Sequence, residues 1–427
     1  MSELIKENSR TKKAKLLTTL SSCCGVTGET VLTDSAIILL YASSLGAGNT
    51  GALFSTSVLP LFNGLAVIPM ACIASRLGVR RLTLAACFIS AIGYIIAGCA
   101  PWLGGAKVIM WGVSCAAMVQ AGFVAGWFPL LNSFLAPDDR VSFLGRMRFF
   151  HQLCATLFVL VSGWFMGKNP DAAHIQAVVL TAAVIFCGRF AFILATPYFP
   201  LSDSQKTAAD SSWRSLCTTA ANPRIRRFAL YQSLFNLASF AVIPVSLVHL
   251  KNLRLPDNII VYISGVSFIG MMLGYWFVRN LVEKCSARRI TAWLAMVCLP
   301  ATLSFFLINK APSPLLCVWL AASLMCVSFA VAAFSVVSSA IMMQFSQQEN
   351  ASMTMAFCNA FYYGSAGGTR LLASWLAGSV WMAAPHGLPT GFSWLYLAFA
   401  VFAVLAACLA TKMIPSEDNE KSINSLS

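Results

Sequence analysis

Four charged residues lie inside long apolar segments of this chain, where their side chains could do chemistry: Glu29, Asp34, Arg189 and Arg370. A charge at the depth of a bilayer costs roughly 2.5–3.5 kcal/mol on insertion scales, so each of them needs a partner or a water-filled cavity. A carboxylate in such a cavity can take up and release a proton. A guanidinium can hold a carboxylate or a phosphate through two parallel hydrogen bonds.

The two carboxylates belong to one unusually polar segment. Glu29 and Asp34 are five positions apart, so on a straight helix their directions differ by roughly 140°. We therefore expect no paired-carboxylate site on one face. One of the two should face a cavity, while the other packs against a neighbouring helix or lies near the outer mouth. At least one of them is predicted to bind a solute or a proton, and a structural ion pair is the alternative.

The two arginines are given different roles. Arg370 follows a run of small residues, 364–369, which lets helices approach closely. Three interpretations of Arg370 stay open: it binds an anionic solute, it forms an ion pair with Asp34 or Glu29 that opens and closes during transport, or it forms a static ion pair. For Arg189 we predict a static role.

Uncharged polar residues also occur in the middle of apolar segments. Such side chains hydrogen-bond either a solute or a neighbouring helix. The candidates for solute binding are Gln120, Asn236, Asn359 and Tyr362. The sequence contains no phosphate-binding Gly-rich loop, no hydrolase triad pattern and no Cys/His spacing typical of zinc, so we expect neither an enzyme nor a cofactor or metal site.

Composition identifies the elements that must position these side chains. Of 427 residues, 58% are apolar and only 10% are charged, whereas soluble domains have about 25% charged residues. A spanning helix needs about 20 mostly apolar residues, and about twelve such segments are present. They cover residues 17–43, 53–75, 82–102, 107–135, 143–167, 175–199, 227–249, 258–280, 288–308, 314–343, 352–380 and 392–413. We predict an all-α, polytopic membrane protein with an N-terminal half (1–199), a cytoplasmic linker (200–227) and a C-terminal half (228–427).

The net charge of +14 could indicate nucleic-acid binding, but its distribution argues against that. Most Lys and Arg residues fall in alternate connections between the predicted spans, which is the bias of cytoplasmic loops. We therefore predict that both termini are cytoplasmic, that the protein lies in the cell's inner (plasma) membrane, and that the bilayer surrounds a monomer.

The two halves share a basic pattern. The loop after the second span contains Arg76, Gly78, Arg80 and Arg81, and the loop after the eighth contains Lys284, Ser286, Arg288 and Arg289 at the same spacing. A second match joins the end of the fifth span, around Trp164, to the end of the eleventh, around Trp375. Two six-helix halves related by a parallel repeat are a known plan of transporters.

These residues resemble the major facilitator superfamily, whose signature between helices 2 and 3 is roughly G-x-x-x-D-R-x-G-R-R. The resemblance covers nearly the whole chain in topology and implies gating loops at both copies of the signature. The residues that match it are Arg76, Gly78, Arg80 and Arg81, with Glu283, Lys284, Arg288 and Arg289 in the second copy. The chain departs from the signature at Ala71 and at Ser75, which stands where the family has an acidic residue. The other interpretation is that these charges only set the orientation of the chain in the membrane and have no part in gating.

The resulting prediction is a secondary transporter that moves a small solute by alternating access. Coupling to protons through Glu29 or Asp34 is favoured, and Arg370 favours an anionic or carboxylate-bearing solute. Two alternatives remain. Ser75 supports a non-transporting sensor or accessory protein on the same scaffold, and multidrug efflux is the third possibility.

Overall fold

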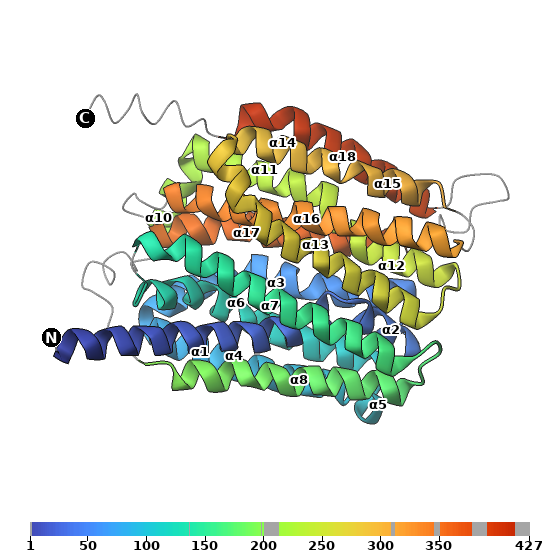
Figure 1. The fold of residues 1–427 in the computed structure, drawn as a ribbon, viewed down its shortest axis with the longest axis horizontal. Coiled ribbons are helices and arrows are strands. Elements are labelled where there is room, and N and C mark those ends of the chain that lie inside the picture. The colour runs from blue at the N-terminus through green and yellow to red at the C-terminus, as the bar shows by residue number, and fades with distance from the viewer. Residues whose placement is uncertain are drawn as a thin grey trace.

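A computed structural model describes residues 2–135, 137–197, 199, 213–308, 312–345, 351–377 and 391–414. Long helices lie side by side in two stacked groups, with the N-terminal group below and the C-terminal group above in Figure 1. The beginning of α1 and the end of α18 lie at one end of the molecule, here called the terminal end. The opposite end, which carries α2, α5, α12 and α15, is called the far end.

Within the part of the chain that the structure describes, the first group contains eight helices, some of which are consecutive pieces of one span. They are α1 (Ser2–Thr33), α2 (Ala36–Ser44), α3 (Gly48–Leu77), α4 (Val79–Gly98), α5 (Ala100–Leu103), α6 (Ala106–Asn132), α7 (Pro137–Met166) and α8 (Ala172–Ala195). The second group follows the same plan. Its helices are α10 (Trp213–Ala221), α11 (Pro223–Ser239), α12 (Val242–Asn252), α13 (Asp257–Lys284), α14 (Ala287–Val297), α15 (Leu299–Phe306), α16 (Pro314–Phe345), α17 (Ala351–Ala377) and α18 (Gly391–Met413).

The spans predicted from hydropathy are present as helices or as broken helix pairs. Within the described residues, ten helical segments are long and apolar enough to cross a membrane, and the bent pair α1–α2 makes up to eleven. The remaining predicted span is α17, which has 27 residues but includes Asn359, two tyrosines and Arg370, so its hydropathy is lower. The polytopic all-α prediction is confirmed. Much of the predicted linker lies outside the described residues, and its described part includes α10 and the start of α11.

Large apolar side chains cover the outer surface of the helices, as expected where lipid is the solvent. Exposed tryptophans lie near the far end on several helices, and such rings are enriched at membrane–water interfaces. They include Trp102, Trp111, Trp164, Trp319, Trp375 and Trp394.

The two groups meet along two helix pairs, α3 with α17 and α7 with α13. Small residues make the first contact possible. A Cβ atom on Gly64 would lie 2.2 Å from the backbone nitrogen of Gly364, and one on Gly367 would lie 2.2 Å from the backbone nitrogen of Leu61. The run of small residues that precedes Arg370 therefore brings two backbones together, as its sequence predicted.

Two spans are broken at corresponding places, one in each half. The pair α1–α2 bends by 44° between Thr33 and Ala36, where the Ser35 side chain accepts a hydrogen bond from the backbone nitrogen of Ile37 and so caps α2. The pair α11–α12 is interrupted between Ser239 and Val242. Irregular backbone at membrane depth is tolerated where it lines a cavity or is buried in protein, so these breaks mark the centre of the molecule.

Candidate functional site

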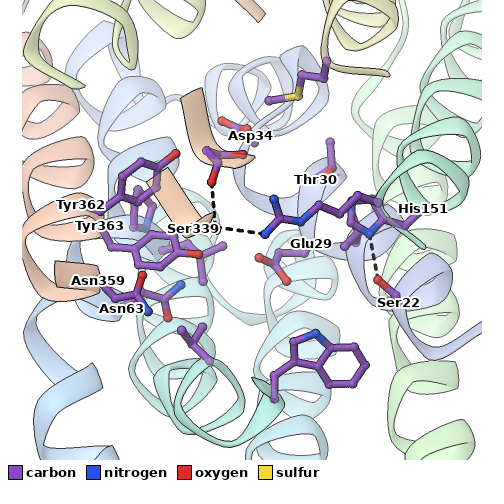
Figure 2. Close-up of a pocket in the computed structure, with 18 of the residues that line it drawn as sticks. Ser22, Glu29, Thr30, Asp34, Asn63, His151, Ser339, Asn359, Tyr362 and Tyr363 are labelled. Atoms are coloured by element: carbon purple, nitrogen blue, oxygen red, sulfur yellow. Dashed lines mark hydrogen bonds between the residues drawn. The ribbon is translucent and has the colours of Figure 1, made fainter. Parts of the chain in front are cut away.

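A cavity of about 330 Å³ lies between the two halves. Side chains from α1, α3, α6, α7 and α8 line it on one side, and side chains from α13, α16 and α17 line it on the other. Figure 2 shows Glu29, Asp34, His151, Asn359 and Tyr363 around this space. Its volume falls within the range of small-molecule sites, about 300–1,000 Å³.

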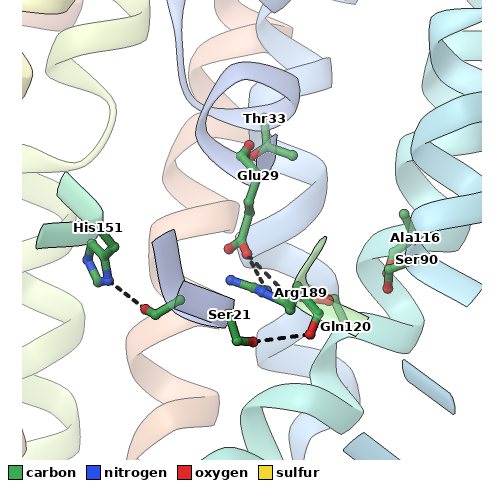
Figure 3. A network of polar contacts seen from close by, with 9 residues as sticks. Ser21, Glu29, Thr33, Ser90, Ala116, Gln120, His151 and Arg189 are labelled. Atoms are coloured by element: carbon green, nitrogen blue, oxygen red, sulfur yellow. Dashed lines mark hydrogen bonds and ion pairs between the residues drawn. The ribbon is translucent and has the colours of Figure 1, made fainter. Parts of the chain in front are cut away.

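Glu29 is held by two residues of its own half. Arg189 Nη1 lies 3.0 Å from Glu29 Oε2, and Gln120 Nε2 donates to the same oxygen at 3.1 Å (Figure 3). The Arg189 side chain is 2% exposed and the Glu29 side chain 26%, so the carboxylate lies at the cavity wall with its partner behind it. The guanidinium also lies over the rings of Phe123 and Phe186, at 4.3 and 5.1 Å.

A glycine makes room for this arginine. A Cβ atom on Gly25 would lie 1.5 Å from Nε of Arg189, so the guanidinium crosses α1 directly over the glycine backbone. Ser21 adds a hydrogen bond to the backbone oxygen of Arg189. The arginine is thus built into the contact between α1 and α8, as a static role would require.

Asp34 is held across the boundary between the halves. Arg370 Nη2 on α17 lies 2.5 Å from Asp34 Oδ1, and the other two donor groups of this guanidinium bind backbone carbonyls. Nη1 donates to Thr56 on α3 at 2.9 Å, and Nε donates to Phe240, in the break between α11 and α12, at 3.1 Å. One guanidinium therefore joins both broken spans and α3, and all three of its nitrogens have partners.

The geometry corrects one expectation about the two carboxylates. Both Glu29 and Asp34 line the same cavity, whereas a straight helix would turn one of them away. The reason is the break after Thr33, which removes Asp34 from the helical period of α1. The expectation that they do not pair with each other holds, because each binds a different arginine.

The other predicted site residues divide into two sets. Gln120, Asn359 and Tyr362 line the cavity. Asn236 does not, because its amide is fully buried between α11 and α17, where Nδ2 donates to the backbone oxygen of Tyr362 at 2.6 Å and to Ser365 Oγ at 3.1 Å. Its position is that of a helix-to-helix contact.

Several cavity residues were not among the candidates, and two of them are basic. Arg148, in the first turns of the predicted span 143–167, lies within α7 and lines the cavity beside Tyr275 of the opposite half, at 5.8 Å from the ring centroid. His151 lies one turn further along and forms a hydrogen bond with Ser22 at 2.8 Å. Both lie inside the predicted span 143–167, so the rule that singled out Arg189 and Arg370, a charge within an apolar segment, could have found Arg148.

The predicted gating loops make contacts within each half. Arg80, at the start of α4, donates to the backbone oxygens of Leu194 and Thr196 at the end of α8. Arg288 holds the equivalent place at the start of α14 and donates to the backbone oxygen of Ile414, just after α18. Cations are favoured at helix C-termini, where carbonyl groups lack partners.

The remaining loop residues add one structural requirement. Gly78 joins α3 to α4 with φ of +84°, a conformation that glycine adopts without strain. Arg76, Arg81 and Arg289 are exposed, and Glu283 and Lys284 lie in the last turn of α13, outside the described side chains. Their gating role stays a prediction.

Hydrogen bonds between the halves gather toward the far end of the cavity. Ser374 donates to the backbone oxygen of Thr50, and the backbone nitrogen of Asp257 donates to the backbone oxygen of Lys168. Together with Arg370 they join the two halves at the far end among the described residues. Nearer the terminal end, Arg148 reaches Ser339 at 3.5 Å, the limit of a hydrogen bond.

Solved transporter structures share this architecture. A mutant form of the nucleoside transporter NupG superimposes with a TM-score of 0.68 at 15% identity, covering 95% of this chain and all of that one. The xylose transporter XylE from E. coli, in a partially occluded inward-open conformation, gives 0.68 at 13% identity over 96% and 99% of the two chains. The fucose:proton symporter FucP from E. coli gives 0.61 at 14% identity over 94% and 98%. The chain has the major facilitator fold.

Sequence comparison adds one partial relative. The magnetosome protein MamH of Paramagnetospirillum magneticum is 28% identical over 206 residues, which are 47% of this chain and 45% of that protein. The chain thus aligns with less than half of the length of the curated relative it matches. No protein-family model matches the chain.

Proposed function

We propose that this protein carries a small solute across the inner membrane by alternating access, with the solute bound in the cavity between the two halves. The observation that supports this most is the cavity itself, which residues of both halves line at the level of the two broken spans. A site at such a boundary is reached from one side and then the other when the halves rock about it.

Polar atoms at this cavity support solute binding. Asn63 Oδ1 and Gln120 Oε1 are buried without a hydrogen-bond partner among the described residues, and both residues line the cavity. Buried polar atoms are rarely left unsatisfied in folded proteins, so these two oxygens are candidates to accept hydrogen bonds from a solute or from water in the cavity. The apolar side chains Phe268, Met271 and Val331 line the C-terminal side, which suits a solute with an apolar part.

Counterflow in proteoliposomes tests the proposal. Vesicles containing the purified protein are preloaded with one member of a panel of sugars, organic acids, amino acids and nucleosides, and uptake of the same labelled compound is followed. We expect transient accumulation for one chemical class. Binding of a compound without counterflow would instead identify a sensor, the alternative that Ser75 favours.

Proton coupling is part of the same proposal. Glu29 and Asp34 are the carboxylates at the cavity, and either could carry the proton. An inward proton gradient should then drive accumulation above the level reached by counterflow alone. Equal accumulation with and without the gradient would remove coupling from the proposal and leave facilitated transport.

A further inference from the structure

The charges around the cavity do not balance, and the excess belongs to one residue. Among the residues that the structure describes, three guanidinium groups line it, those of Arg148, Arg189 and Arg370, against two carboxylates, Glu29 and Asp34. Arg189 and Arg370 take one carboxylate each. Arg148 has no carboxylate within ion-pair distance among the described residues.

Arg148 has few partners for its donors. Its guanidinium has five N–H groups, and among the described residues it forms one hydrogen bond, the contact of 3.5 Å to Ser339. The Ser339 hydroxyl donates to the backbone oxygen of Ser335 at 2.7 Å, so it meets Arg148 only as an acceptor. The ring of Tyr275 covers one face of the guanidinium, which fixes its direction without using its N–H groups.

The repeat in the sequence shows that this charge has no counterpart in the other half. At the spacing that superimposes Trp164 on Trp375, Arg148 of α7 falls on Asn359 of α17, and both line the cavity. One of the two equivalent places is thus cationic and the other is a neutral amide. A solute held between them would have a negative end toward α7 and an uncharged hydrogen-bonding end toward α17.

The geometry points to Arg148 as the binding residue for the acid group of a small organic anion, a carboxylate with a partly apolar body. This inference rests on the proposed transport function, because it names the class of solute for the same cavity. It also moves the anion site away from Arg370, whose donors are taken by Asp34, Thr56 and Phe240. The adaptable side chains of Met147, Met271 and Met342 line the same cavity and suit the apolar part of the solute.

Matched acid and amide pairs test the charge alone. Thermal unfolding of the purified protein is measured with millimolar nicotinate or nicotinamide and lactate or lactamide, and with inorganic phosphate. We expect at least one of the two carboxylates to raise the unfolding temperature and its amide to have no effect. Arg148→Gln should bind that acid about 10- to 100-fold more weakly, the range for a hydrogen bond to a charged group, and Arg148→Lys should retain part of the affinity.

Arg146→Gln is the matched control, because Arg146 is exposed on the same helix and does not line the cavity. It should bind the acid as the unmodified protein does. The unfolding temperature of each variant without ligand shows whether Arg148→Gln is folded, and Arg148→Lys gives the comparison if it is not. Any one of four results would overturn the inference. The protein could bind acid and amide equally, bind phosphate alone or bind neither carboxylate, or Arg148→Gln could bind the acid as tightly as the unmodified protein.

Counterflow separates this inference from the proposed function. If a carboxylate binds through Arg148 but does not exchange across the vesicle membrane, the anion site stands and the transport function fails. If an uncharged solute exchanges at the same rate in the unmodified protein and in Arg148→Gln, transport stands and the anion site fails.

Discussion

Replacing Arg370 by glutamine should open the far end of the cavity. The guanidinium holds Asp34, Thr56 and Phe240 together, and these belong to the break of the first span, to α3 and to the break of the seventh span. Glutamine is neutral and too short to reach all three. The substitution therefore destabilises the conformation in which the far end is closed. The conformation with an open far end, in which we expect these contacts to be broken, is not destabilised in this way.

The magnitude follows from the burial of the pair. Removing one partner of a buried ion pair costs about 3–5 kcal/mol, because the other charge is left without compensation. The Arg370 side chain is 6% exposed but that of Asp34 is 32% exposed, so water can solvate the remaining carboxylate and the lower end applies. A loss of about 3 kcal/mol would change the ratio of closed to open molecules about 100-fold, since each 1.4 kcal/mol is a factor of ten.

Distances between labels on the two halves measure this ratio. Ser44 and Asn252 are exposed at the far end, one in each half, and can carry labels on unnatural amino acids, so that the 15 native cysteines remain in place. We expect one short distance in the unmodified protein and a large population at a longer distance in Arg370→Gln. Asp34→Asn should shift the distribution in the same direction, and Arg254→Gln, an exposed arginine at the same end, should not. Equal distributions in Arg370→Gln and Arg254→Gln would refute the role assigned to Arg370.

Three further predictions concern packing and stability. Gly64→Ala places a Cβ atom 2.2 Å from the Gly364 backbone, and this overpacking should lower the unfolding temperature by destabilising the protein by about 1–3 kcal/mol. Gly364→Ala should be tolerated, because the nearest contact of its Cβ atom is at 3.9 Å. Arg80→Ala and Arg288→Ala should lower thermal stability without changing the far-end distances, and Arg81→Ala should change neither quantity. Altered far-end distances in Arg80→Ala or Arg288→Ala would restore the gating interpretation. Arg189→Gln should destabilise the protein by roughly 3 kcal/mol, and adding Glu29→Gln to that variant should cost much less than Glu29→Gln alone. A double-mutant cycle measures this difference, and additive costs would show that the ion pair contributes little to stability.

Much of this architecture could be predicted from the sequence because it depends on composition along the chain. Apolar runs of spanning length, basic residues in alternate connections and the repeated basic pattern define twelve spans in two halves. The small residues 364–369 predicted a close helix contact, and an ion pair of Arg370, with Asp34 as one possible partner, was part of two of its three interpretations. These inferences need only spacing along the chain and the cost of a charge in lipid.

The arrangement of the site depends on features that spacing does not contain. A five-residue interval predicts divergent carboxylates only if the helix is continuous, and the break after Thr33 removes that condition. The partnership of Arg189 with Glu29 requires Gly25 on a helix distant in sequence, and nothing near Arg189 announces it. Arg148 was not singled out because it stands in the first turns of the predicted span 143–167, where basic residues are common near the membrane surface, although α7 carries it to the cavity.

The two cavity carboxylates differ in what a rocking motion must do to them, and this difference identifies the one that should couple transport to protons. Glu29 binds Arg189 and Gln120, which belong to its own half and move with it. Asp34 binds Arg370 of the other half, so separation of the halves at the far end breaks that pair. A carboxylate that is paired in one conformation and unpaired in a cavity in the other binds a proton more readily in the second.

We therefore expect Asp34→Asn to abolish accumulation driven by a proton gradient while counterflow persists, and Glu29→Gln to keep gradient-driven accumulation at lower thermal stability. The reverse pattern, with accumulation lost in Glu29→Gln and kept in Asp34→Asn, would place coupling at the pair within the N-terminal half and contradict this reasoning.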